Sequence, residues 1–145
     1  MTFSYSLQSV LKVKEHEKVE AQQRYSSATE AFEEAATGLY ERLKQKEELE
    51  QTYSRSLETG TTVSELNHLQ NRIRFLETQI RASRETTDLA RARMRTSEAR
   101  LGKKSADVLK YDKIRERKLA DYNQERKLQE MKNLDELAVQ QFFRK

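Results

Sequence analysis

The sequence of 145 residues contains no proline, no cysteine and no tryptophan, and only three glycines. Tight turns depend on glycine and proline, so a chain with so few of them can reverse direction only once or twice. This shortage excludes sheet folds and compact folds of several helices. The absence of cysteine excludes a disulfide framework and thiolate metal sites. Long helices are therefore the expected architecture.

Apolar residues are also scarce: hydrophobic residues make up 35% and charged residues 36% of the chain. Disorder is one interpretation of such a composition, but it predicts enrichment in Pro, Gly and Ser without periodicity. Here Leu, Ala, Glu, Lys, Arg and Gln dominate, and these are strong helix formers. The composition favours long helices over disorder.

Neither a membrane span nor a signal peptide is visible in the sequence. No run approaches the roughly 18 apolar residues of a spanning helix, and the polar residues 1–6 lack a signal-peptide core. We therefore expect a cytosolic protein without an integral membrane segment. The net charge of +4 is divided unevenly, because residues 1–60 hold 8 basic and 11 acidic residues whereas 61–145 hold 20 and 13. This asymmetry suits pairing of the two halves, or an anionic partner for the second half.

Apolar residues recur in alternating steps of three and four along two long segments, a pattern typical of coiled coils. Between the segments, Gly60 fits the left-handed conformation that ends a helix, and Thr62 with Glu65 forms a capping box. Two helices joined by so short a connection run antiparallel. The sequence predicts a single all-α domain over residues 1–145. It is a long antiparallel two-helix coiled coil with helix one over about 4–58, a turn over about 59–62 and a longer helix two over about 63–143.

The hairpin predicts a register in which the numbers of facing residues add to about 122. This register sets large residues opposite small ones, for example Phe32 near Ala90 and Ala28 near Met94, as close packing requires. It also places Phe3 near Leu119 and leaves about the last 20 residues without a partner in the chain. Polar residues interrupt the seam and make the core thin: Lys14, Lys18, Arg42, Lys46, Ser83, Thr87 and Lys104.

No motif for catalysis or cofactor binding is present. The chain lacks a Gly-rich phosphate loop, a nucleophile elbow and a His, Cys and Asp cluster. His16 and His68 fall on different predicted helices, so we expect both to be solvated rather than to bind a metal. Two helices enclose no pocket that would shift the pKa of a carboxyl group. We expect neither enzyme activity nor a cofactor.

Residues 72–104 hold ten basic residues and four acidic ones. One interpretation is a solvated face that pairs with glutamates of the first helix: Glu33, Glu34, Glu41, Glu47 and Glu48. The other is a docking surface for an acidic protein or a phosphate backbone. We expect no nucleic-acid partner, because Phe75 is the only aromatic residue in this stretch and no groove-reading module is visible.

The last turns of the chain end in two adjacent aromatic residues, Phe142 and Phe143. Each would bury on the order of 200 Å² against a partner. One interpretation is that these two residues fold back on the chain or fray. The other is that they form a partner-binding end.

Three segments, in this order, resemble the family of the flagellar export protein FliJ over essentially the whole chain. The first is Phe3, Leu7, Val10 and Leu11 followed by Lys14, Glu15 and Glu17. The second is residues 69–80, and the third is residues 134–138 with 142–144. The alternatives are an unrelated cytosolic coiled-coil adaptor or chaperone, and a basic helical nucleic-acid binder.

The resemblance implies a coiled-coil shaft in the bacterial flagellar type III export apparatus, at the cytoplasmic face of the membrane at the flagellar base. Its implied partners are the hexameric export ATPase, the membrane export gate protein and export chaperones. The implied gate-binding tip comprises Leu49, Tyr53, Leu69, Gln70, Arg72, Ile73, Leu76, Glu77 and Ile80. Arg72 stands where an aromatic residue occurs in relatives. The open end, implied to bind the ATPase or chaperones, comprises Phe3, Leu7, Leu11, Met131, Leu134, Leu137, Phe142 and Phe143.

Overall fold

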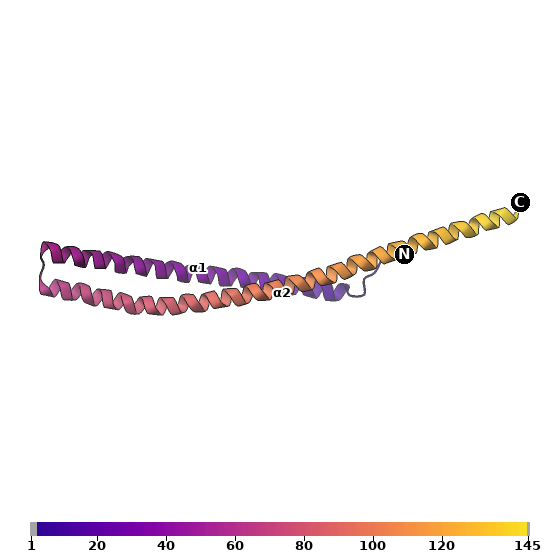
Figure 1. Ribbon diagram of the computed structural model, residues 1–145. Coiled ribbons are helices and arrows are strands. Elements are labelled where there is room, and N and C mark those ends of the chain that lie inside the picture. Colours follow the sequence, from indigo (N-terminus) through magenta and orange to yellow (C-terminus); the bar gives the residue numbers. More distant parts are fainter. Residues whose placement is uncertain (1–2, 145) are drawn as a thin grey trace. The chain divides into compact units, whose positions relative to one another are not determined.

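The computed structural model describes residues 3–144, which form two helices joined by a short connection (Figure 1). Helix α1 spans Gln8–Thr59 and helix α2 spans Val63–Arg144. The two helices form an antiparallel hairpin in which α2, with 82 residues, is longer than α1, with 52. The predicted all-α two-helix hairpin is therefore confirmed. Met1, Thr2 and Lys145 lie outside the described residues, and so does the start of the polar N-terminal stretch.

Helix α1 begins at Gln8, four residues after the predicted start, because the preceding segment folds onto α2. The N–H of Gln8 donates to the carbonyl oxygen of Tyr5 at 3.0 Å and closes a turn. Tyr5 is buried, and its hydroxyl donates to the carbonyl oxygen of Tyr111 at 3.2 Å. The Phe3 ring lies 5.5 Å from that of Tyr122. Burial of these two aromatic side chains takes residues 3–7 out of the helical path.

The connection between the helices has the predicted local chemistry. Gly60 has a φ of 85°, the left-handed conformation that ends α1. The hydroxyl oxygen of Thr62 accepts a hydrogen bond from the backbone N–H of Glu65 at 3.2 Å, as in a capping box. The hydroxyl of Thr61 donates to the Glu65 carboxylate. Gly60 ends α1 and the Thr62 cap begins α2, so the chain reverses its direction within a few residues.

The hairpin comprises two compact units, each built from both helices. The turn unit contains residues 21–101, and the terminal unit contains residues 1–20 and 102–145, described here over 3–20 and 102–144. The single domain over residues 1–145 stays a prediction.

Contacts across the turn unit follow the predicted register. Lys46 Nζ lies 3.5 Å from a carboxylate oxygen of Glu77, and the Arg91 guanidinium lies 5.4 Å from the centre of the Phe32 ring. The residue numbers of both pairs add to 123, next to the predicted 122. The buried side chains of this unit are Ala21, Leu76, Ile80, Ser83 and Thr87.

Two of these buried residues are polar, and both find partners. Thr87 donates to the carbonyl oxygen of Ser83 at 2.7 Å, and Arg42 donates to the Ser83 hydroxyl oxygen. Their burial is tolerated because no buried polar side-chain atom in the described residues lacks a hydrogen-bond partner. The polar interruptions predicted here are thus part of the seam.

The core of the terminal unit is formed by Tyr5, Leu11 and Val108. Four partly buried residues pack against it: Phe3, Leu7, Tyr111 and Ile114. Beyond Tyr122 this packing stops, and every residue from 123 to 144 is exposed. Residues 123–144, called the overhang below, therefore extend past the paired part of α2, as the register predicts.

Candidate partner-binding surfaces

The predicted tip residues fall into two groups in the turn unit. Leu76 and Ile80 are 8% and 5% exposed, so they pack in the seam between the helices. Gln70 and Arg72 are exposed. Glu77 is engaged by Lys46 at 3.5 Å. The remaining predicted residues are half-buried: Leu49, Tyr53, Leu69 and Ile73. Burial in the seam and exposure to solvent are thus divided among different members of the predicted set.

An open groove of about 710 Å³ lies between the two helices of the turn unit. From α1 it is lined by Gln45, Glu48, Leu49 and Thr52, and from α2 by His68, Asn71, Arg72, Phe75, Leu76 and Gln79. Three predicted tip residues line it, namely Leu49, Arg72 and Leu76. The groove combines apolar and polar groups without enclosing a ligand, which suits the side chains of another protein better than a small molecule.

Phe75 lines the groove but is absent from the predicted tip set. Its side chain is 64% exposed at the groove. An exposed aromatic side chain beside a groove offers a large apolar contact area to a partner protein. The signal was present in the sequence, because Phe75 is apolar yet falls between the seam positions Ile73 and Leu76.

The predicted open-end residues also separate. Leu11 is only 2% exposed, and Phe3 and Leu7 pack against the same core. The C-terminal members lie in the overhang and are 55–80% exposed: Met131, Leu134, Leu137, Phe142 and Phe143. The structure therefore assigns the N-terminal members to packing and leaves the C-terminal members accessible.

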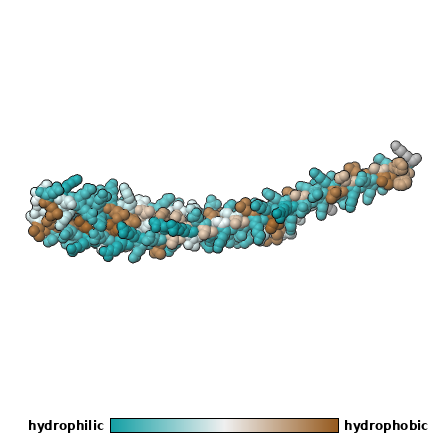
Figure 2. Space-filling view, in the orientation of Figure 1, coloured by the Kyte–Doolittle hydropathy of each residue, from teal (hydrophilic) through white to brown (hydrophobic). Residues whose placement is uncertain are grey.

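The overhang carries an apolar face that is larger than predicted. Leu128 and Val139 are 55% and 53% exposed and add to the predicted residues. The Phe142 and Phe143 rings meet edge to face at 5.9 Å without covering each other. Figure 2 shows hydrophobic side chains along this end of α2 with no second helix over them.

The apolar side chains of the overhang are spread around α2. At 3.6 residues per turn, Leu128, Met131, Leu134 and Phe142 are centred about 180° around the helix from Tyr122, the last seam residue, whereas Leu137 and Phe143 lie about 60° from it on either side. A simple extension of α1 would therefore cover only part of this apolar surface.

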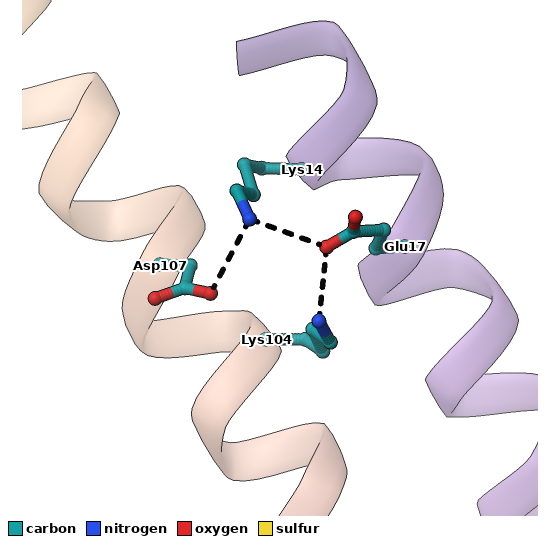
Figure 3. Close-up of polar contacts among 4 residues, drawn as sticks. All are labelled: Lys14, Glu17, Lys104 and Asp107. Atoms are coloured by element: carbon teal, nitrogen blue, oxygen red, sulfur yellow. Dashed lines mark hydrogen bonds and ion pairs between the residues drawn. The ribbon is translucent and has the colours of Figure 1, made fainter. Parts of the chain in front are cut away.

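Four charged residues link the helices of the terminal unit (Figure 3). Lys104 Nζ lies 3.0 Å and Lys14 Nζ lies 3.5 Å from the same Glu17 oxygen, and Lys14 lies 3.9 Å from Asp107. The hydrogen bond from Lys104 is the largest cause that holds the pKa of Glu17 below its ordinary value, and both lysine charges add to it. Lys14 and Lys104, which interrupt the apolar seam as predicted, join the helices through opposite charges.

The basic stretch does not pair with the five glutamates of α1 that were predicted, and its Lys104 pairs with Glu17 instead. Within residues 3–144, no ion pair involves Glu33, Glu34, Glu41, Glu47 or Glu48. That interpretation was wrong because these side chains extend into solvent, where an ion pair gains too little to order two long side chains.

The described residues offer no site for a metal ion or a membrane span. His16 pairs with Glu20 on its own helix at 3.2 Å, and no group of three or more metal-ligating side chains occurs within residues 3–144. Neither helix, over the same residues, contains a stretch that is long and apolar enough to cross a bilayer.

These features define a class of protein: an antiparallel helical hairpin whose accessible apolar and charged surfaces suit partner proteins. The family model described as "Flagellar FliJ protein" matches residues 3–145. The flagellar FliJ protein of Bacillus subtilis (strain 168) is 31% identical over 143 residues, which cover 99% of this chain and 97% of that protein. The chain belongs to the FliJ family of flagellar proteins, as its motifs predicted.

A solved structure shares the fold. The putative YscO homolog CT670 from Chlamydia trachomatis is similar with a TM-score of 0.67 at 20% identity, covering 94% of this chain and 93% of that one.

Proposed function

We propose that this chain is a non-catalytic component of the flagellar type III protein export apparatus. It acts as a coiled-coil shaft that promotes assembly and activity of the hexameric export ATPase ring, connects the ring to the membrane export gate and handles export chaperones. It would act at the cytoplasmic face of the membrane, at the base of the flagellum. Membership of the FliJ family supports this role.

The observation that carries the proposal is the uncovered apolar face of the overhang. Phe142 and Phe143 are 77% and 80% exposed, and Leu134 is 65% exposed. Contiguous apolar surface of this kind marks protein interaction sites. We assign the overhang to the ATPase ring or to an export chaperone, with the N-terminal predicted residues Phe3, Leu7 and Leu11 holding the adjoining core.

The groove of the turn unit is the proposed contact with the export gate. Phe75 offers an exposed aromatic anchor, and the nearby Arg72 and Gln70 offer exposed polar groups. Aromatic and arginine side chains dominate the energetics of many protein interfaces. Leu76 and Ile80 support this surface from within the seam.

Deletion of residues 134–145 tests the assignment of the overhang. The deletion removes none of the core residues of the terminal unit, so the circular dichroism and the melting of the paired helices should be retained. ATP turnover by the purified export ATPase, measured across concentrations of the added chain, should lose its stimulation. A matched pair of double substitutions, Phe142→Ser with Phe143→Ser against Gln140→Ser with Gln141→Ser, separates loss of apolar surface from loss of helix. Full stimulation by the truncated chain would rule out the overhang as the contact with the ring.

A further inference from the structure

Four arginines of α2 in the turn unit form a row of uncompensated positive charge. Arg74, Arg81, Arg84 and Arg95 are all exposed. Within the described residues, none of their guanidinium groups takes part in an ion pair, hydrogen bond or cation–π contact. At 3.6 residues per turn the four positions fall within a sector of about 80° on the helix surface. We call them the arginine row.

The acidic groups within this sector are already engaged by other cations. Glu77 pairs with Lys46 at 3.5 Å, and Asp88 pairs with Arg91 at 3.3 Å. Arg91 also lies over the Phe32 ring at 5.4 Å, so its charge serves contacts inside the hairpin. Glu85, at the edge of the sector, is exposed and forms no ion pair with any residue between 3 and 144. The arginine row therefore keeps an excess of positive charge.

A small depression of mixed character lies directly beside the row. Arg81 and Arg84 border a groove of about 210 Å³ that is also lined by Leu43, Ile80 and the paired Lys46 and Glu77. Leu43 is 37% exposed and offers apolar surface there. A ligand that follows the row thus meets cations beside a recess to which Leu43 contributes an accessible apolar side chain.

We propose that the arginine row binds an acidic amphipathic helix of a partner protein, with carboxylates on the arginines and an apolar side chain in the groove of Leu43 and Ile80. Guanidinium groups bind carboxylates through two parallel hydrogen bonds, which favours arginine at such a surface. A duplex backbone or an anionic lipid surface would meet the same charges but would place nothing in the groove. None of the four arginines belongs to the overhang or lines the groove at Phe75, so the peptide test does not depend on the proposed export role.

A synthetic fluorescent peptide provides the probe. It is a helical peptide with a row of glutamates beside a row of leucines, and a scrambled peptide of the same composition is the reference. Fluorescence anisotropy with the full chain should show tighter binding of the patterned peptide, weakening steeply as salt is raised. The double substitution Arg81→Glu with Arg84→Glu should weaken binding about tenfold or more, because like charges then face each other.

The chain supplies a matched control in Arg93 and Arg100. Both are exposed and form no ion pair within the described part of the chain, and they are centred roughly 130° away around α2. Arg93→Glu with Arg100→Glu changes the net charge equally and should retain binding. Circular dichroism shows whether charge reversal perturbs the helix. If it does, the neutral double substitution Arg81→Gln with Arg84→Gln replaces the charge-reversed variant in the binding test.

Four outcomes would overturn the proposal. They are equal losses in the two charge-reversed pairs, equal binding of the two peptides, and tighter binding to duplex DNA or phosphatidylglycerol vesicles than to the patterned peptide. The fourth is that this chain forms a dimer and that the substitutions in the arginine row abolish it. That result would show that a second copy of the chain occupies this surface.

Discussion

Lys104 of α2 donates a hydrogen bond of 3.0 Å to Glu17 of α1, joining residues 87 positions apart in the sequence. Both side chains are partly exposed, at 24% and 32%. Polar residues at seam positions of a coiled coil specify register, because a slipped pairing leaves them without partners. We interpret the charged group of Lys14, Glu17, Lys104 and Asp107 as a device that fixes the register of the terminal unit beside a small apolar core.

The Glu17 contact predicts a dependence of stability on pH. The pKa of Glu17 is lowered by folding, first by the hydrogen bond from Lys104 and also by the charges of Lys104 and Lys14. A carboxyl group with a lowered pKa stabilises the fold above its unfolded pKa and loses this effect as pH falls through its folded pKa. We therefore expect Glu17→Gln to melt below the wild type at neutral pH, and the difference to disappear well below pH 4.5. Thermal melts by circular dichroism across pH measure this, with the exposed Glu15→Gln as control. Identical pH profiles for the two variants would refute the assignment.

Leu11 should matter far more to stability than its neighbour Val13. Leu11 is 2% exposed in the core of the terminal unit, whereas Val13 is 57% exposed on the same helix. Leu11→Ala should lower the free energy of unfolding by about 2–5 kcal/mol, the usual cost of a large-to-small core substitution. Val13→Ala should change it by about 0.5 kcal/mol or less. Urea unfolding followed by circular dichroism compares the two, and similar losses would show that the core is misplaced.

The glycines at positions 38 and 60 should respond oppositely to substitution by alanine. Gly60→Ala places a side chain at a φ of 85°, which costs about 1–2 kcal/mol. Gly38 lies inside α1 with nothing within 4 Å of an added Cβ, so Gly38→Ala should stabilise the hairpin by about 0.5–1 kcal/mol. The two melting temperatures should therefore move in opposite directions from that of the wild type. A rise in both would mean that the turn tolerates a different backbone conformation.

Phe75 should affect gate binding without affecting folding. Phe75 and Leu89 are 64% and 65% exposed on the same helix, but only Phe75 lines the groove of the turn unit. Phe75→Ala should weaken binding to the purified cytoplasmic part of the gate protein, and Leu89→Ala should not, since truncating an interface anchor costs about 2 kcal/mol or more. Calorimetric titration measures the affinities, and circular dichroism checks that both variants fold. Equal affinities for the two variants would show that the gate protein does not bind at this groove.

The candidate surfaces were predicted from the sequence, but not which of their residues are accessible. Heptad spacing marks Leu76 and Ile80 as apolar, yet a seam residue and a binding residue look alike in a periodic pattern. Phe75 differs because it is apolar outside the seam, but Leu89 shares that feature, so only the position of Phe75 at the groove distinguishes it. The unpaired arginines required coordinates, because charge counts cannot show which side chains meet.

The sequence by itself determined the hairpin, its turn and its register. These depend on local rules, namely helix propensity, the left-handed Gly60, the Thr62 cap and the step of three and four, and each acts over a few residues. The tertiary structure decided those features that depend on contacts between residues far apart in the sequence. It placed Tyr5 and Phe3 against α2, delaying α1 to Gln8, and it joined Glu17 to Lys104. It also left the four arginines of the row without partners, because pairing depends on where long side chains end in space rather than on their order in the chain.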